Sequence, residues 1–140
     1  MNIRIMAVAA LCLGSVAFAA DDRAKLNGTW QSSNGSETWV LQDKGETWHI
    51  AYSQGNQKPA EFDCAADGRD CNVKEAGHSA KVSLYFNGPR LVELETKGTE
   101  VIKRRFAIAE QGDLMDVEVI PVVSTTEKPA TLHFKRVTPK

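Results

Sequence analysis

The sequence predicts an all-β protein: an antiparallel up-and-down β-barrel of about eight to ten strands that follows a cleaved signal peptide. Turn-forming dipeptides recur roughly every ten residues, apolar and polar residues alternate between them, and no later stretch carries a convincing helical period. The dipeptides are Asn34–Gly35, Lys44–Gly45, Gly55–Asn56, Asp67–Gly68, Asn87–Gly88, Lys97–Gly98 and Gly112–Asp113. Consecutive hairpins close most simply into a barrel, because closure removes exposed sheet edges.

The first element is an N-terminal leader at residues 1–19. Arg4 places a positive charge before the uncharged run Ile5–Phe18, and Ala17–Ala19 matches a small-residue cleavage site. This pattern predicts a secretory signal peptide and a periplasmic or secreted location, and it leaves residues 20–140 for a single barrel domain.

The formal net charge of −1 becomes −2 when Arg4 is removed with the leader. Without a basic excess, we expect no nucleic-acid partner, and no membrane span is expected in the mature chain.

The cysteines predict one structural disulfide. Cys12 lies inside the leader, where acylation is a weaker alternative because Ala9–Leu11 matches a lipoprotein motif poorly. Cys64 and Cys71 then remain as a pair in an oxidising compartment. The Asp67–Gly68 turn signal between them would bring both cysteines face to face across a hairpin. Their spacing fits neither a C-x-x-C redox motif nor a zinc site.

Eight segments alternate in the manner of half-buried strands, and their apolar residues are assigned to the barrel interior. The segments and interior residues are 37–42 (Trp39, Leu41), 47–52 (Trp48, Ile50, Tyr52), 60–64 (Ala60, Phe62, Cys64), 81–86 (Val82, Leu84, Phe86), 90–96 (Val92, Leu94), 100–109 (Ile102, Phe106, Ile108), 114–120 (Met115, Val117, Val119) and 131–137 (Leu132, Phe134). Residues 21–27 have room for one helical turn, and Pro121–Pro129 is the longest irregular connection.

Two motifs carry a family resemblance. Gly28–Trp30 resembles the G-x-W signature on the first strand of lipocalins and their relatives, the calycin superfamily. The resemblance implies that Arg136, near the end of the last strand, packs over Trp30 and closes the barrel floor, where cation–π attraction would hold the pair. The Asp67–Asp70 turn and the hairpin before Lys103–Arg105 also resemble uncharacterised secreted bacterial lipocalin-like proteins. The usual lipocalin lid sequences are missing, so the resemblance implies no subfamily ligand.

Arg104 interrupts the apolar face that Ile102 and Phe106 define, and a lone arginine inside an apolar barrel is costly unless it is paired. One hypothesis makes Arg104 an anchor for an anionic head group, because the guanidinium fork suits a carboxylate. In the alternatives, a bulge turns Arg105 or neither arginine inward, Arg104 lies at the rim, or it pairs internally with Glu93 or Glu118.

The aromatic residues either line a cavity or fill a solid core, and a barrel of nine or ten strands would favour the cavity. These residues are Trp39, Trp48, Tyr52, Phe62, Phe86 and Phe106. The predicted ligand-binding residues are therefore Arg104, Trp39, Trp48, Tyr52, Phe86 and Phe106, and the predicted structural residues are Trp30, Arg136, Cys64 and Cys71.

Catalysis is not expected. By alternation His49 and His133 point away from the core, and His78 is assigned to a loop. No G-x-S-x-G element or spaced metal-ligand set occurs, so the sequence predicts no enzyme, cofactor or metal. A haem or metal site at His133 would need its ring to point inward. Three aspartates could bind calcium, but turn chemistry accounts for two of them. The three are Asp63, Asp67 and Asp70.

Two classes of function follow. The first is a periplasmic or secreted barrel that binds a small apolar or anionic amphipathic ligand, with Arg104 as polar anchor. The second is a protein-interaction module with a solid interior, such as an inhibitor of a secreted enzyme. That module would dock on its protein partner through residues 21–27 or the Pro121–Pro129 connection.

Overall fold

The computed structural model describes residues 22–75, 77–123 and 126–138, so the predicted signal peptide lies outside the described residues. A helical turn at residues 22–24 precedes ten strands. The strands are β1 (Gly28–Ser32), β2 (Glu37–Asp43), β3 (Trp48–Gln54), β4 (Ala60–Cys64), β5 (Asp67–Glu75), β6 (His78–Asn87), β7 (Arg90–Lys97), β8 (Glu100–Ile108), β9 (Leu114–Val123) and β10 (Ala130–Arg136).

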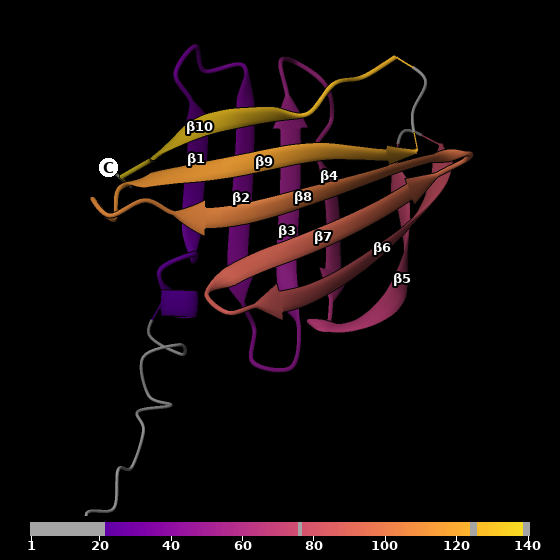
Figure 1. Ribbon diagram of the computed structural model, residues 1–140, viewed down its shortest axis with the longest axis horizontal. Coiled ribbons are helices and arrows are strands. Elements are labelled where there is room, and N and C mark those ends of the chain that lie inside the picture. Colours follow the sequence, from indigo (N-terminus) through magenta and orange to yellow (C-terminus); the bar gives the residue numbers. More distant parts are fainter. Residues whose placement is uncertain (1–21, 76, 124–125, 139–140) are drawn as a thin grey trace, which may run out of the picture.

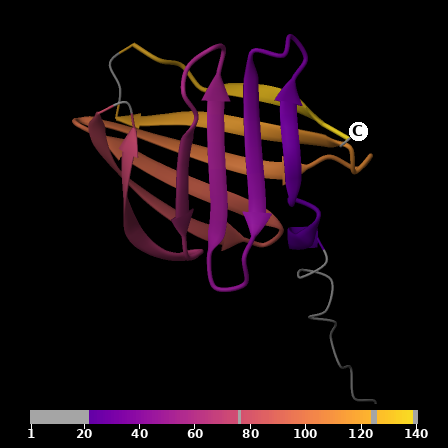
Figure 2. The ribbon, with the colours of Figure 1, turned by 180° about the vertical axis from the view of Figure 1, so that it is seen from behind.

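The described strands form one antiparallel sheet in the order β4-β3-β2-β1-β10-β9-β8-β7-β6-β5. Figure 1 shows β6 to β9 crossing in front of the layer that β1 to β4 form, and Figure 2 shows the same layers from behind. Pairing of β1 with β10 joins the two layers. The predicted up-and-down barrel is confirmed, with a strand number at the top of the expected range.

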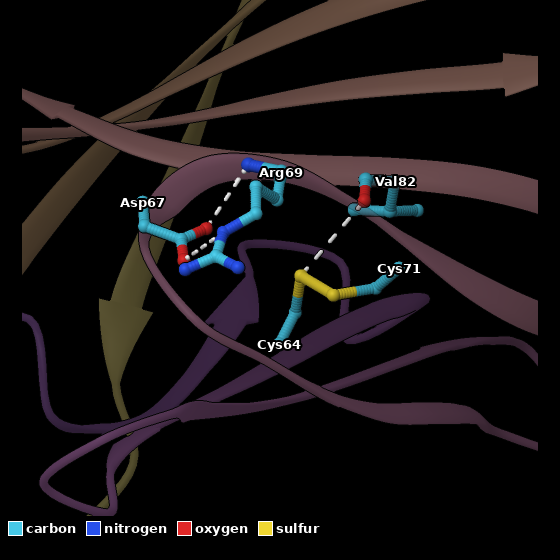
Figure 3. Close-up of a disulfide and its surroundings, with 5 residues drawn as sticks. All are labelled: Cys64, Asp67, Arg69, Cys71 and Val82. Carbon is cyan, nitrogen blue, oxygen red and sulfur yellow. Dashed lines mark hydrogen bonds and ion pairs between the residues drawn. A yellow bond between two sulfur atoms is a disulfide. The ribbon is translucent and has the colours of Figure 1, made fainter.

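The disulfide between Cys64 and Cys71 is confirmed, but the hairpin that was predicted to bring the two residues together is wrong (Figure 3). Cys64 pairs with Trp48 of β3, and Cys71 pairs with Val82 of β6. Strands β4 and β5 are the two ends of the described sheet order, so the disulfide joins the two sheet edges across a Cα–Cα distance of 5.9 Å.

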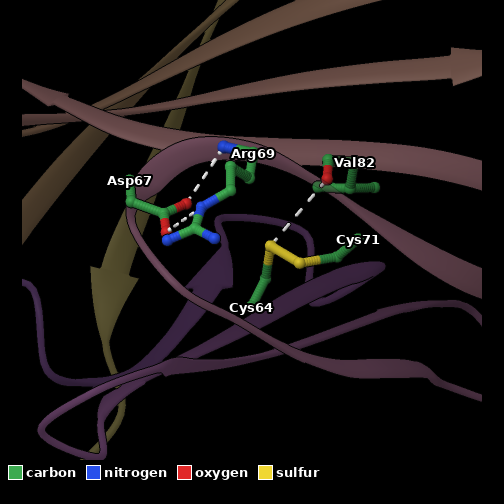
Figure 4. Close-up of polar contacts among 5 residues, drawn as sticks. All are labelled: Cys64, Asp67, Arg69, Cys71 and Val82. Carbon is green, nitrogen blue, oxygen red and sulfur yellow. Dashed lines mark hydrogen bonds and ion pairs between the residues drawn. A yellow bond between two sulfur atoms is a disulfide. The ribbon is translucent and has the colours of Figure 1, made fainter.

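The Asp67–Gly68 pair starts strand β5 at an irregularity rather than forming a hairpin turn. The register with β6 shifts between Asp67 and Asp70, and Gly68 adopts a φ of 81°. The Asp67 carboxylate accepts hydrogen bonds from the backbone N–H of Arg69 at 3.0 Å and from its Nε at 2.9 Å (Figure 4). These local contacts satisfy the bulged backbone, and the strand continues as β5, which the alternation pattern did not predict.

Strand β7 has the opposite phase to the one predicted. Leu91 is fully buried in the core and Glu93 is 2% exposed on the cavity side, so the buried Val92 and the half-buried Leu94 belong to the opposite, outer face of the strand. Leu91 and Val92 are adjacent, so an apolar residue faces the interior in either phase of the strand. The prediction took the phase that kept Glu93 out of the interior, and this prediction was wrong. The other predicted interior residues of the barrel are buried or half-buried.

The barrel floor is built around Trp30, which is fully buried and pairs directly with Arg136. The Arg136 guanidinium carbon lies 4.2 Å from the Trp30 ring centroid. Its Nη1 donates to the Asn27 carbonyl at 2.6 Å, and its Nη2 donates to the Lys25 carbonyl at 2.8 Å. A Cβ on Gly28 would lie 2.5 Å from Arg136 Nη1, which explains the glycine of the G-x-W motif.

The segment before β1 is part of this floor. Leu26 is fully buried in the core, and its carbonyl accepts a hydrogen bond from the Trp30 indole at 3.0 Å. Arg23 lies over the Phe86 ring at 4.4 Å and donates to the Gly88 carbonyl at 3.1 Å. The N-terminal segment therefore closes one end of the barrel.

Candidate ligand-binding site

Two adjoining cavities of about 340 and 180 Å³ lie inside the barrel. Both are lined by Trp39 of β2, Tyr52 of β3, and Ile102 and Arg104 of β8. The remaining apolar wall comes from Ala60, Phe62, Val73, Val117, Val119 and Leu132. The barrel is thus hollow at the end that the β3–β4 and β7–β8 connections form.

Arg104 points into the cavity, and its partner is Glu93. Nη1 of Arg104 donates to Oε1 of Glu93 at 2.6 Å, with the two side chains 16% and 2% exposed. Arg105 lies on the opposite face, where it forms a 3.0 Å ion pair with Glu118. Of the arrangements considered for Arg104, the structure has the internal ion pair, and no bulge brings Arg105 inward.

A second carboxylate reaches the same guanidinium. Glu95 Oε1 lies 3.6 Å from Arg104 Nη1. Burial lowers the pKa of Arg104 and the Glu93 and Glu95 carboxylates raise it, with a net value above the ordinary one. Arg104 therefore stays cationic, and the triad of Arg104, Glu93 and Glu95 combines one positive charge with two carboxylates.

Aromatic rings form the wall beside this triad. The Trp39 ring centroid lies 4.4 Å from that of Tyr52 and 5.0 Å from that of Phe106, which packs edge-on. The Arg104 guanidinium carbon lies 5.6 Å from the Trp39 ring centroid. The Tyr52 hydroxyl donates to Oε1 of Glu37 at 2.8 Å. Aromatic surface and charge thus meet in one place.

The structure divides the predicted ligand-binding residues into two groups. Trp39, Tyr52 and Arg104 line the cavity, and the fully buried Phe106 supports Trp39. Trp48 and Phe86 pack against each other at 5.6 Å and border a separate surface depression beside the floor. These two residues are not brought to the cavity, because they lie at the floor ends of their strands.

Sequence reasoning named Glu93 only as one possible partner of Arg104, and it did not assign Glu93 or Glu95 to the ligand-binding site. Glu93 and Arg104 are direct register partners across the β7–β8 hairpin, as are Glu95 and Ile102. Counting outward from the Lys97–Gly98 turn signal would have paired Glu93 with Arg104. The symmetry of the hairpin predicts this pair, but the assumption that charged residues face solvent assigned Glu93 to the outer face.

The histidines lie away from the cavity. His49 Nδ1 lies 2.8 Å from Asp63, and His133 Nδ1 lies 2.7 Å from Asp116. His78 begins strand β6, so its assignment to a loop was wrong.

In the described ranges, no three potential metal-ligating side chains come together, Asp63, Asp67 and Asp70 included. Among these same residues, no helix has the length and apolar character to span a bilayer.

The predicted irregular connection is shorter than expected. Pro121, Val122 and Val123 belong to β9, so they are not part of an irregular connection. Val122 and Val123 are about half exposed, at 54% and 53%.

These features define a ten-stranded antiparallel up-and-down barrel with an internal cavity. No family model and no curated protein sequence matches the chain. A secretory abundant heat soluble protein from Ramazzottius varieornatus is similar in structure, with a TM-score of 0.68 and 10% identity over 81% of this chain and 96% of that chain. A Schistosoma mansoni fatty acid binding protein in complex with arachidonic acid has a TM-score of 0.68 and 13% identity, covering 84% of this chain and 99% of its own.

A third solved structure, the REP1-NXSQ fatty acid transporter, has a TM-score of 0.65 and 16% identity, covering 84% of this chain and 99% of that chain. At these identities the likeness shows the fold. The predicted up-and-down barrel fold is thereby supported, and the resemblance to the calycin superfamily and to secreted bacterial lipocalin-like proteins stays a prediction.

Proposed function

We propose that the protein binds a small apolar or amphipathic molecule inside the barrel, in the periplasm or outside the cell, and that its role is binding rather than catalysis. The observation that carries this proposal is the internal cavity, with its aromatic wall and its largely buried charged triad. At about 340 Å³, the larger cavity lies near the lower end of the range typical of small-molecule sites, about 300–1,000 Å³. The preformed cavity would keep the ordering cost of binding low.

Two further observations support the proposal. Solved structures with this fold include a fatty acid binding protein in complex with arachidonic acid. The Cys64–Cys71 disulfide is consistent with an oxidising compartment.

The geometry favours ligand binding over docking through the N-terminal segment. Leu26 is part of the core, and the carbonyls of Lys25 and Asn27 accept hydrogen bonds from Arg136. A truncation of residues 20–26 would therefore disrupt the floor rather than remove a free docking arm.

Native mass spectrometry tests the proposal. Protein purified without detergent from its host is expected to carry a discrete non-covalent adduct, and the delipidated protein is expected to bind Nile red saturably at one site. Ala60→Phe, which fills the cavity, should abolish both signals. Ala130→Phe, at an exposed position on β10, should leave both unchanged. A bare protein that also fails to bind Nile red saturably would overturn the proposal.

A further inference from the structure

The guanidinium in the cavity already has its anionic partners. Arg104 Nη1 lies 2.6 Å from a Glu93 oxygen and 3.6 Å from a Glu95 oxygen. A ligand carboxylate at Arg104 would either displace Glu93 or add a third negative charge to the same cation. Displacement would leave Glu93, which is 2% exposed, as a buried carboxylate without its ion pair, and this is costly.

The net charge of the whole cavity lining also disfavours an anionic ligand. The two adjoining cavities are bordered by five carboxylate side chains and two cationic ones, a formal balance of −3. The carboxylates belong to Glu37, Glu93, Glu95, Glu100 and Glu127, and the cations are Lys97 and Arg104. Lys97, Glu100 and Glu127 are exposed. The four buried or half-buried charges, Glu37, Glu93, Glu95 and Arg104, keep a formal balance of −2, and a low-dielectric wall around them attracts cations and repels anions.

The aromatic wall complements this charge. Trp39 and Tyr52 border the cavity next to the triad and offer aromatic surface to the apolar part of an amphipathic cation. Glu95 keeps 19% of its side chain exposed, so an ammonium group in the cavity can reach it without breaking the Arg104–Glu93 pair. A single positive charge there would bring the triad to neutrality.

We propose that the ligand of the cavity is an amphipathic organic amine, with its ammonium group beside Glu95 and its apolar part against Trp39, Tyr52 and Ile102. This inference rests on the proposed function, because it assigns the chemical class of the bound molecule. In this arrangement Arg104 is not an anchor for an anionic head group. It pairs with Glu93 and holds that carboxylate in place, and the excess negative charge of the triad selects the ligand.

Three probes of equal chain length test this assignment: decylamine, decanol and decanoate, each titrated calorimetrically into the delipidated protein at pH 7 below its micellar concentration. Decylamine is expected to bind about tenfold more tightly than decanol, and decanoate more weakly than decanol, because one opposite charge in a partly desolvated site adds at least this factor. Decanoate or decanol binding as tightly as decylamine would overturn the inference and leave the proposed function intact. Binding of none of the three, together with no Nile red binding, would overturn both.

A charge-neutral variant assigns the effect to the triad. Glu95→Gln keeps the size and the Arg104–Glu93 pair, and it should weaken decylamine binding about tenfold while leaving decanol unchanged. Glu61→Gln, an exposed glutamate on β4, is the matched control and should leave all three affinities unchanged. Equal effects of the two substitutions would show that overall charge, rather than the triad, sets the preference, and would refute the assignment to Glu95.

Discussion

Replacement of Arg104 by methionine is expected to destabilise the barrel strongly. The substitution keeps an apolar chain of moderate length and removes the cation that faces Glu93 at 2.6 Å. Glu93 is 2% exposed and Glu95 19%, so two neighbouring carboxylates would remain inside the barrel without the guanidinium between them. Breaking a buried ion pair on one side costs about 3–5 kcal/mol, and we expect a loss of that size in the free energy of unfolding.

The companion variants separate charge from packing. Glu93→Leu alone leaves Arg104 with Glu95, so its cost should be smaller than that of Arg104→Met. The double variant removes the buried pair entirely, and replacement of such a pair by apolar residues is often neutral or stabilising. Arg104→Met combined with Glu93→Leu should therefore recover most of the stability lost in Arg104→Met alone.

Urea unfolding at pH 7, followed by tryptophan fluorescence, measures these effects. Arg105→Met is the matched control, because Arg105 forms a partly exposed 3.0 Å pair with Glu118 on the outer face, and it should cost no more than about 1 kcal/mol. An Arg104→Met variant as stable as Arg105→Met, or a double variant whose loss equals the sum of the single losses, would refute the buried-pair reasoning.

Three further predictions concern the frame of the barrel. Replacing Cys64 and Cys71 by alanine should lower the free energy of unfolding by about 2.4 kcal/mol in the chain-entropy model for a separation of 7 residues, and equal stability with and without reductant would contradict this. The hydrogen bond from the backbone N–H of Arg69 lowers the pKa of Asp67 below 3.8, against a weaker opposing effect of burial. The ionised Asp67 carboxylate therefore stabilises the fold above pH 3.8, and this stabilisation is lost as the pH falls through the folded pKa. An NMR titration midpoint of Asp67 at or above 3.8 would contradict this prediction. Arg136→Lys should cost about 2–3 kcal/mol in urea unfolding, because lysine cannot make both carbonyl hydrogen bonds of the fork, whereas the exposed neighbour Lys135→Ala should be neutral.

Most strand positions followed from local chemistry. Pairs such as Lys97–Gly98 and Asn87–Gly88 do occupy tight turns, since Gly98 and Gly88 both adopt a φ of 61°. The alternation of Met115, Val117 and Val119 likewise predicted the inner face of β9. These signals are local in the sequence, so they predict turns and buried faces without knowledge of the partner strands.

Strand β5 was missed because its signal is weak and its start is irregular. Between Asp67 and Glu75 the main apolar residue is Val73, and Cys71, two residues before it, was assigned to a hairpin. Only the ladder with β6, which a single strand cannot reveal, makes this polar segment a strand.

The candidate site was predicted in part for a related reason. Trp39, Tyr52 and Arg104 could be named from the face they share with apolar neighbours. Glu93 was named only as one of two possible partners of Arg104 and Glu95 was not named, because alternation treats each charge alone, whereas the structure pairs charges across two strands inside the barrel. A buried charge becomes acceptable only when its partner is known, and the partner is a property of tertiary structure.

The disulfide has a geometric consequence for the described barrel. A ladder of hydrogen bonds holds neighbouring strands at a nearly constant spacing of about 4.8 Å, and each described pair from β4 round to β5 is held in this way. The junction of β4 with β5 is spanned instead by the side chains of Cys64 and Cys71. At this junction the circumference of the barrel can change without the loss of a backbone hydrogen bond, while the covalent link limits how far the two strands can move apart.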